Sequence, residues 1–298
     1  MILVTGGTGF IGRSLIRALV SSGEQVRVLL RPSKTSPNFP KGISVEVAVS
    51  SFSDQRSLRA ALKGVDYLYH FAGAERQGLN ANLNQIDVEG TATLMRAAKD
   101  ANLKRVIYLS HHGADRGSAY PVMKAKGIAE NWIINSGIPY TILRTGAVYG
   151  PGDQFTVPLA RLLRISPYFF LMPGDGSNLL QPIWIDDLVT CILLASADET
   201  KVNRVIPMGG IEHMPYLEIV KLVMKQTGIS RKPVGVTPEF LRGLSLWIAQ
   251  VYPKFPVSIF WLDYLAVDRI TSLDSVPREF GLIPTRLKNQ IDYLTRKN

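Results

Sequence analysis

Tyr120 and Lys124 combine residue types and a spacing that suit proton transfer. They stand four residues apart at the head of a predicted helix, which would place both side chains on one helical face. Pro121 is compatible with this helix because it falls in the first turn. A tyrosine ordinarily titrates near about pH 10, and a neighbouring ammonium group lowers that value by stabilising the phenolate. Such a pair can give a proton to a carbonyl oxygen or take one from an alcohol.

The same spacing also arises by chance, and a glycine-rich turn near the start of the chain gives it context. The glycines follow an apolar run at 2–4 and precede a helical pattern of apolar residues at 15–20. A strand, a tight turn and a helix N-terminus together bind a pyrophosphate, because backbone N–H groups and the helix dipole face the phosphates. The alternative is an ordinary βα turn that happens to be rich in glycine. For a dinucleotide, the expected contacts are Gly6, Thr8, Gly9, Phe10, Ile11 and Gly12.

Short apolar runs alternate with helical patterns along the first half of the chain. This order predicts an α/β fold, a doubly wound parallel Rossmann sheet with crossover helices. The predicted strands are 2–5, 25–30, 43–47, 67–71, 105–110 and 140–144, and the predicted helices are 10–22, 55–62, 83–101 and 120–135.

The pattern changes after Asp153. Residues 154–180 form an apolar segment interrupted by prolines, and a helix through residue 197 and a strand at 204–207 follow. We therefore expect a dinucleotide-binding domain of residues 1–153, to which 181–207 returns. Residues 154–180 and 208–298 are expected to form a smaller C-terminal substrate domain over the carboxyl ends of the strands, where ligands bind in such sheets.

The composition limits the classes of protein to which the chain can belong. Of its 298 residues, 46% are hydrophobic and 19% are charged, as in globular proteins. The single cysteine, Cys191, lies in an apolar run, which excludes a disulfide framework and favours a reducing compartment. The first strand begins at residue 2, and no run reaches the roughly 18 apolar residues of a membrane span. We expect a cytoplasmic protein, or one held peripherally at a membrane, without a metal site.

The net charge of +10 and the pI of about 9.7 indicate an anionic partner. A phosphorylated cofactor, a membrane surface and an acidic protein are all compatible with this charge. Nucleic acid is not expected, because the basic residues are scattered and do not form runs with interleaved aromatic residues.

Arg31 ends the second predicted strand, where the adenine ribose of a dinucleotide would lie. An acidic residue there would accept a hydrogen bond from the ribose 2′-hydroxyl, whereas an arginine suits a 2′-phosphate. NADP(H) is therefore favoured over NAD(H). A single arginine is also compatible with an ordinary solvated surface side chain.

Further segments carry a family resemblance, together with the glycine turn and the Tyr120–Lys124 pair. They are His70–Gly73, Asp87–Thr91, Ser110–Asp115, Glu130, Leu143–Thr145, Val148–Asp153 and Gln181–Asp187. From Ile2 to about Leu194 the chain resembles the extended or atypical short-chain dehydrogenase/reductases, an epimerase/dehydratase-like family. The segments at 110–124 and 181–182 are most similar to the branch related to the 39-kDa accessory subunit of respiratory complex I.

This resemblance implies roles for individual residues. It implies that the glycine turn holds the pyrophosphate, that Ala72 and Gly73 line the cofactor, and that Ser110 lies beside the nicotinamide. Lys124 would hydrogen-bond the nicotinamide ribose, and Tyr120 would be the catalytic acid/base.

Two positions depart from the family pattern. The serine or threonine that usually stands two residues beyond Ser110 and polarises the substrate oxygen is His112 here. A neutral imidazole can donate the same hydrogen bond, so His112 is a candidate catalytic residue. The alternative is that His111 and His112 are ordinary loop residues. The aspartate that usually follows the third strand near the adenine is Ser51.

The segment Phe240–Ala266 is unusually apolar and aromatic, with few charges. One interpretation is a lid that faces lipid or binds an isoprenoid, helped by the basic charge of the chain. The other is a domain core or an oligomer interface, where most aromatic residues pack. Pro253 and Pro256 interrupt any long amphipathic helix, which favours the second interpretation.

These observations give one main hypothesis and two alternatives. The main hypothesis is an NAD(P)(H)-dependent oxidoreductase that acts on a carbonyl or alcohol of an apolar, isoprenoid- or quinone-like small molecule, with Tyr120 as acid/base. A nucleotide-sugar epimerase or dehydratase uses the same groups, but 154–180 offers few partners for a diphosphate besides Arg161 and Arg164. The other alternative is a non-catalytic NADPH-binding accessory or assembly protein, whose fold the nucleotide stabilises.

Overall fold

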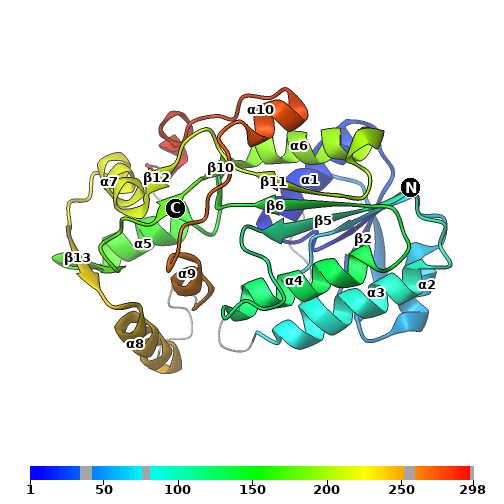
Figure 1. Ribbon diagram of the computed structural model, residues 1–298, viewed down its shortest axis with the longest axis horizontal. Coiled ribbons are helices and arrows are strands. Elements are labelled where there is room, and N and C mark those ends of the chain that lie inside the picture. Colours follow the sequence, from blue (N-terminus) through cyan, green and yellow to red (C-terminus); the bar gives the residue numbers. More distant parts are fainter. Residues whose placement is uncertain (34–41, 76–80, 252–258, 296–298) are drawn as a thin grey trace. The chain divides into compact units, whose positions relative to one another are not determined.

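A computed structural model describes residues 1–33, 42–75, 81–251 and 259–295. The chain divides into two compact units, whose elements are labelled in Figure 1. Unit 1 comprises Met1–Ala74, Asn82–Arg144 and Val189–Pro207. Unit 2 comprises the described residues of 75–81, 145–188 and 208–298.

Unit 1 is built on a seven-stranded sheet, counted over the described residues. In spatial order its strands are β11 (Arg204–Met208), β6 (Tyr140–Thr145), β5 (Arg105–His111), β4 (Tyr67–His70), β1 (Ile2–Thr5), β2 (Val26–Leu30) and β3 (Glu46–Val49). Neighbouring strands from β3 through β1 to β5 run parallel. The predicted doubly wound Rossmann-type α/β sheet is therefore confirmed.

Helices connect these strands. They are α1 (Phe10–Ser21), α2 (Gln55–Leu62), α3 (Gly90–Ala98), α4 (Pro121–Ile134) and α6 (Ile185–Ala197), with the π-helix η2 (Asn84–Glu89) and the 3₁₀ turn η3 (Glu199–Lys201). The predicted helix at 83–101 is thus two elements, η2 and α3. Asp54 explains where α2 begins, because its carboxylate accepts hydrogen bonds from two backbone N–H groups of the first turn.

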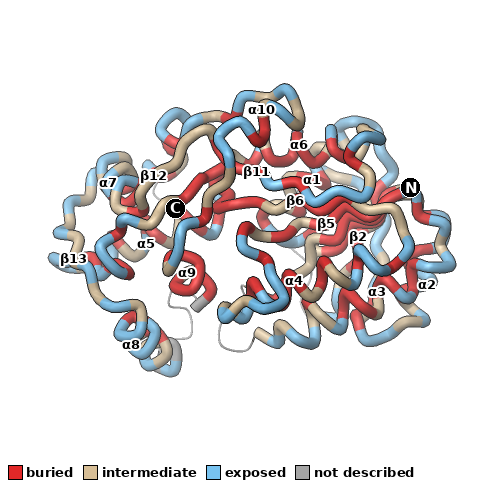
Figure 2. Tube along the Cα trace, viewed as in Figure 1, coloured by how far each residue is buried: buried red, intermediate tan, exposed pale blue. Residues whose placement is uncertain are grey.

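The core of unit 1 lies between the sheet and its helices. The central strands of the sheet are buried in Figure 2, and Leu3, Leu68 and Val106 are fully buried together with Leu94 of α3. Burying one such aliphatic side chain contributes about 1.5–3 kcal/mol. Glu130 and Arg144 add an ion pair that joins α4 to β6, with Oε1 and Nε 2.9 Å apart. This pair fixes the helix that follows Tyr120.

Unit 2 contains short strand pairs and helices. The pairs are β7 (Val148–Tyr149) with β10 (Ile183–Trp184), β8 (Phe169–Pro173) with β13 (Lys232–Val236), and β9 (Leu179–Leu180) with β12 (Met214–Pro215). The helices are α5 (Thr156–Ile165), α7 (Tyr216–Thr227), α8 (Pro238–Val251), α9 (Ile259–Tyr264) and α10 (Ser275–Phe280), with the 3₁₀ turns η4 (Leu287–Asn289) and η5 (Asp292–Leu294).

The family-like motifs of unit 2 have structural partners. Asp153 accepts hydrogen bonds from the backbone N–H groups of Gly150, Phe155 and Val157, which fixes the start of α5. The side-chain amide of Gln181 donates to the carbonyl of Gly210, and its oxygen accepts from the N–H of Thr271. These motifs therefore tie distant segments of unit 2 together.

The unit boundaries differ from the predicted ones. Residues 145–153 and 181–188 group with unit 2, whereas the sequence placed them with the dinucleotide-binding domain. The reason is that β7 pairs with β10 rather than with the central sheet. The strand predicted at 204–207 does join the sheet, as β11 beside β6. Pro253 and Pro256 lie outside the described residues.

Candidate functional site

The carboxyl ends of neighbouring strands bring predicted site residues to one edge of unit 1. The chain passes from β1 to β2 and β3 on one side, and then to β4 and β5 on the other. Gly6 follows β1, Arg31 follows β2, Ala72 and Gly73 lie just beyond β4, and Ser110 is near the end of β5. Open parallel sheets bind ligands in the crevice at such a switch point.

The glycine turn folds tightly against the end of β4. Gly6 has a φ of 72°, and a Cβ added there would lie 2.5 Å from the carbonyl carbon of Phe71. A Cβ on Gly12 would overlap the carbonyl oxygen of Gly6. Neither position accepts a side chain, because the obstructing atoms belong to the backbone.

Gly9 has a different reason to be glycine. Its φ is −73°, its N–H donates to the carbonyl of Gly6 at 3.0 Å, and an added Cβ would meet that oxygen alone, at 3.2 Å. Gly9 is also the N-cap of α1, and no side chain among the described residues caps this helix end. The fold itself nearly tolerates a methyl group here. Open space beside uncapped N–H groups fits an anion such as a pyrophosphate.

The other predicted contacts of the turn differ in exposure. Thr8 is exposed, Ile11 is half-buried and Phe10 is buried in the core. Phe10 therefore offers a ligand its backbone rather than its ring.

A buried histidine network holds the loop after β4. His70 Nδ1 lies 2.7 Å from Thr5 Oγ1, and His70 Nε2 lies 2.9 Å from Thr91 Oγ1. Thr5 Oγ1 also accepts the N–H of Ala72 at 3.3 Å. Burial, reinforced by the charge of Lys126, lowers the pKa of His70 to about 3. The ring is thus neutral and bonds to one hydroxyl as donor and to the other as acceptor.

A buried ion pair joins the same loop to α4. Asp87, in η2, is 1% exposed, and its Oδ2 accepts the N–H of Ala74 at 2.9 Å. Its Oδ1 lies 3.2 Å from Nζ of Lys126, whose ammonium lies 5.4 Å from the centre of the Tyr108 ring. π-Helical turns are rare and are frequent at functional sites. Of the two lysines in α4, Lys126 rather than the predicted Lys124 is buried in the interior of unit 1.

The predicted proton-transfer residues lie in different environments. Ser110 is buried, and its hydroxyl has no hydrogen-bond partner among the residues that the structure describes. His112 is also buried, whereas Tyr120 is half-buried and Lys124 is exposed.

The start of α4 corrects one expectation from the sequence. Tyr120 is the N-cap residue, with a ψ of 119°, and its carbonyl accepts the N–H of Lys124 at 2.9 Å. It precedes the helix instead of occupying the first turn. Helical spacing alone therefore does not place the phenol and the ammonium on one face.

The predicted adenine end of the site is solvent-facing. Arg31 follows β2 directly and is exposed. Ser51 follows β3 and is half-buried, with its hydroxyl 2.8 Å from that of Ser53.

Comparison with known proteins now identifies the family. The sequence pattern of a family described as NAD(P)H-binding matches residues 6–157. The chain belongs to this NAD(P)H-binding family. Its matched region covers the glycine turn, the loop after β4 and the Tyr120–Lys124 segment.

Two relatives and one solved structure extend this result. Sterol demethylase protein B of Methylococcus capsulatus is 28% identical over 312 aligned residues, which cover 95% of this chain and 93% of that protein. The mitochondrial NADH dehydrogenase (ubiquinone) 1 alpha subcomplex subunit 9 of Arabidopsis thaliana is 27% identical, over 96% of this chain and 74% of that protein. The NADPH complex of the quinone oxidoreductase QOR2 of Escherichia coli has a TM-score of 0.78, over 99% of this chain and all of that one. At 18% identity, this likeness shows the fold alone.

These matches confirm the predicted relationship to the extended short-chain dehydrogenase/reductases and to their respiratory branch. The cofactor class is accordingly a nicotinamide dinucleotide. The residues present fit such a group: a Cβ at Gly9 would occupy space that the fold leaves open, and Ser110 keeps a buried hydroxyl without a partner among the described residues. Unpartnered buried hydroxyls are uncommon in folded proteins, and a hydrogen bond to a bound ligand would satisfy this one.

Two kinds of feature are absent from the described residues. Over these ranges, no helix is both long enough and apolar enough to cross a membrane. The same residues contain no cluster of three His, Cys, Asp or Glu side chains able to hold a metal ion.

Sequence reasoning missed Lys126 and gave Asp87 no specific role. Lys126 and Asp87 are 39 residues apart in the sequence, and no short-range pattern marks either of them as a member of this buried pair.

Proposed function

We propose that the chain is an oxidoreductase that transfers hydride between NADP(H) and a carbonyl or alcohol carbon of an apolar, isoprenoid- or quinone-like small molecule. The row of groups at the carboxyl edge of unit 1 carries this proposal. It runs from the glycine turn after β1, through the loop after β4, to the buried Ser110 and His112 at β5. Bound nicotinamide supplies or accepts the hydride.

Side chains of unit 1 are assigned the proton transfer and the hydrogen bonds to the substrate and cofactor. Tyr120 donates a proton to the substrate oxygen during reduction and removes it during oxidation, with Lys124 supplying positive charge beside the phenolate. A ring N–H of His112 donates a hydrogen bond to the same oxygen. The hydroxyl of Ser110, buried and without a partner in the described part of the chain, is available to the carboxamide end of the nicotinamide.

Replacing Tyr120 tests this assignment. In Tyr120→Phe, turnover of an identified carbonyl substrate should fall at least about 100-fold, because general acid catalysis contributes that much or more. The dissociation constant of NADPH should stay within about twofold of the parent value, since binding does not need the hydroxyl. Tyr140→Phe, at another half-buried tyrosine of unit 1, is the matched control. Unchanged turnover in Tyr120→Phe would disprove the acid/base role.

Two lysine variants test which ammonium assists. Lys124→Met should lower kcat and leave the fold intact, because Lys124 is exposed. Lys126→Arg keeps the buried charge beside Asp87 and should retain turnover. The opposite result, full activity in Lys124→Met and none in folded Lys126→Arg, would show that Lys126 rather than Lys124 supplies the charge that assists Tyr120.

We further propose that NADP(H) is the preferred cofactor, supported by the position of Arg31 directly after β2. Arg31→Asp should weaken NADPH binding by about tenfold or more and strengthen NADH binding, because the carboxylate repels a 2′-phosphate and accepts from a 2′-hydroxyl. Arg96→Asp, an exposed position on α3, controls for the change of net charge. An equal loss of affinity for NADPH and NADH in Arg31→Asp would show that Arg31 does not contact the ribose phosphate.

A second candidate function is a nucleotide-binding subunit without turnover. The similarity to a subunit of NADH dehydrogenase and the exposed Lys124 support it. Both candidates predict that NADPH raises the melting temperature, because ligand binding stabilises the folded state. Only the enzyme should show nicotinamide oxidation that depends on substrate and on Tyr120.

A further inference from the structure

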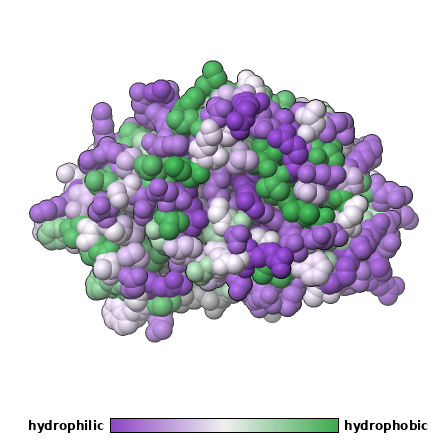
Figure 3. Space-filling model, in the orientation of Figure 1, coloured by the Kyte–Doolittle hydropathy of each residue, from purple (hydrophilic) through white to green (hydrophobic). Residues whose placement is uncertain are grey.

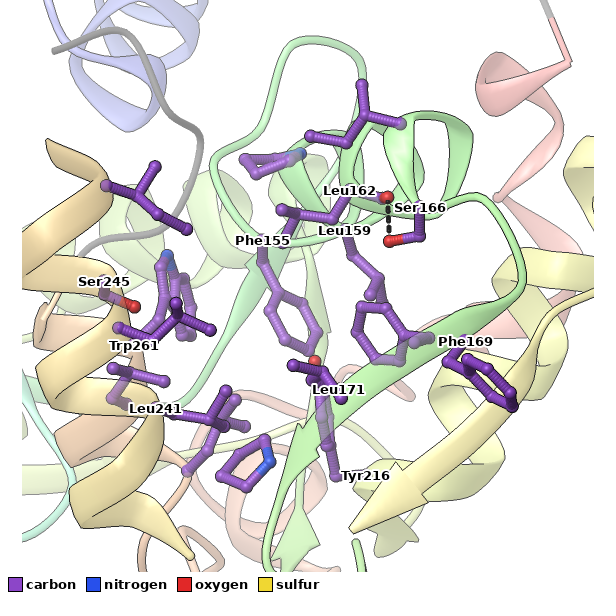
Figure 4. Close-up of a pocket in the computed structure, with 18 of the residues that line it drawn as sticks. Phe155, Leu159, Leu162, Ser166, Phe169, Leu171, Tyr216, Leu241, Ser245 and Trp261 are labelled. Carbon is purple, nitrogen blue, oxygen red and sulfur yellow. Dashed lines mark hydrogen bonds between the residues drawn. The ribbon is translucent and has the colours of Figure 1, made fainter. Parts of the chain in front are cut away.

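Unit 2 contains an apolar cavity of about 400 Å³. Most of its lining residues come from α5, β8, α8 and α9, and α7 contributes Tyr216. Figure 4 shows Leu241 and Ser245 of α8 and Trp261 of α9 on one side, with Leu159 and Leu162 of α5 across from them. The volume lies in the range of small-molecule sites. Its lining residues belong to the segments that the sequence predicts as the substrate domain, but none of them has an assigned role in the redox chemistry.

The chemistry of the walls restricts what this cavity can hold. None of the described residues that line it carries a charge. The hydroxyl of Ser166 donates to the carbonyl of Leu162 at 2.8 Å and is therefore satisfied. Tyr216 is 6% exposed, and burial raises the pKa of its phenol. A phosphate or sugar would lose its hydration without compensation here, whereas a hydrocarbon has none to lose.

Exposed apolar side chains surround the cavity and form what we call the apolar rim. Ile165, Phe169 and Leu171 line the cavity and are 59%, 55% and 38% exposed. On α8, Phe240 and Trp247 flank the lining residues and are 55% and 64% exposed. Hydrophobic patches likewise interrupt the hydrophilic surface of unit 2 in Figure 3. Contiguous exposed apolar surface of this kind marks interaction sites.

Cations stand beside the apolar rim. Lys232 is the partner of Phe169 in the β8–β13 register, which places the two side chains on the same face of this strand pair. The guanidinium of Arg231 donates to the carbonyl of Ser166, which holds its charge at the end of α5. The cations beside the rim thus suit an anionic head group, and the apolar walls of the cavity suit a hydrocarbon chain.

We propose that this cavity binds the hydrocarbon chain of an anionic amphiphile and that the head group stays at the cationic rim. A methylene is about the size of a water molecule, which occupies roughly 30 Å³, so the cavity has room for roughly a dozen carbons. A membrane lipid and a free fatty acid share this chemistry. The inference goes beyond the redox function, because binding requires neither nucleotide nor turnover.

A chain-length series on the unaltered protein is the first test. Fatty acids of increasing length are titrated by calorimetry in the absence of nucleotide. Affinity should rise about fourfold for each added methylene, the ratio that hydrocarbon burial gives. The rise should stop near a dozen carbons, where the cavity is full. Affinity that does not depend on chain length would overturn the proposal and leave the redox function standing.

A cavity-filling variant with a matched control is the second test. Leu244 lines the cavity, and Leu246, on the same helix and also half-buried, does not. Leu244→Trp should weaken binding at least about tenfold, and Leu246→Trp should not change it. Equal binding by both variants would contradict the site. If Leu244→Trp does not fold, Lys232→Glu replaces it: fatty acid binding should weaken severalfold while binding of the matching fatty alcohol is kept.

Fluorescence distinguishes the two sources of the chain. The protein has four tryptophans, and replacing Trp132, Trp184 and Trp247 by phenylalanine leaves Trp261 in the cavity wall as the reporter. Free fatty acids with brominated chains should quench Trp261. Quenching also by vesicles of anionic phospholipid with brominated chains identifies the bilayer as a source, and quenching by the fatty acid alone identifies the free amphiphile. Quenching by neither would refute the proposal.

Discussion

The carboxyl edge of unit 1 and the cavity of unit 2 differ in the atoms that they present. At the edge of unit 1, the proposed nucleotide contacts are backbone N–H groups and a few buried polar side chains, and hydrogen bonds involving Thr5, His70 and Asp87 hold the adjacent loop. In unit 2, apolar side chains from several elements form the walls of the cavity, and their polar neighbours are satisfied or neutral. The first arrangement requires particular residues at particular positions. The second requires volume and apolar character, which many substitutions preserve.

The largest expected effect follows from the buried ion pair of unit 1. Lys126→Met should lower the free energy of unfolding by about 3–5 kcal/mol, because it leaves the carboxylate of Asp87 buried without its cation. Lys124→Met, at an exposed position of the same helix, should change it by less than about 0.5 kcal/mol. Urea denaturation compares the two. Similar losses of stability in the two variants would show that the polar interior of unit 1 tolerates substitutions as well as the walls of the cavity in unit 2 do.

The second-largest effect is expected from acid, which should destabilise unit 1 before unit 2. The pKa of His70 is lowered to about 3 in the fold, against an ordinary value of 6.5, so the unfolded chain binds the additional proton first. Stability should therefore fall as the pH drops below about 6.5, by about 3 kcal/mol at pH 4. Hydrogen exchange should show the loss in the β4–β5 region ahead of unit 2. A parallel acid dependence in His70→Asn would refute the assignment.

The glycine turn offers a finer test, because one substitution should change nucleotide affinity and another should change the stability of the fold. Gly9→Ala should cost about 2 kcal/mol of nucleotide affinity, roughly thirtyfold, because its methyl group would point into the space for the pyrophosphate. The melting temperature without nucleotide should hardly move. Gly12→Ala should lower that temperature, since its Cβ overlaps the backbone at Gly6. Full nucleotide affinity in Gly9→Ala would place the phosphates elsewhere.

The smallest effect is expected on the exposed side of α8, away from the cavity. Gly243 lies inside α8, is exposed, and has no atom within 4 Å of an added Cβ. Gly243→Ala should raise the free energy of unfolding by about 0.5–1 kcal/mol through helix propensity alone. Fatty acid binding should stay the same. A loss of stability in Gly243→Ala would show that a neighbouring group packs against this position and that only glycine leaves room for it.

Local patterns made much of unit 1 predictable. The glycine turn, most of the strands and α2 follow from residue types within a few positions of one another, and α2 begins and ends at the predicted residues, 55–62. The strand predicted at 43–47 is an exception, because β3 spans Glu46–Val49. The predicted helix at 83–101 became two elements, because a π-helical turn places Asp87 beneath the loop after β4. Such a placement depends on a partner, Lys126, that no short-range pattern specifies.

The cavity could not be predicted for a related reason. The apolar character of 154–180 and 240–266 was evident from the sequence, but not that α5 and α8 face one another across an open space. The residues of the C-terminal segment also divide between a buried and an exposed side of α8. Leu241 and Ser245 are buried, while Phe240 and Trp247 are exposed. Helical periodicity separates these faces only once the helix is known to begin at Pro238.

The pairing of β11 with β6 has a consequence for how the protein is made. Unit 1 draws its last strand from Arg204–Met208, after the chain has already contributed Thr145–Leu188 to unit 2. During synthesis, the β6 edge therefore stays unpaired until the ribosome has passed residue 208. Unpaired strand edges invite association between nascent chains, so this interval is when the protein most needs a chaperone.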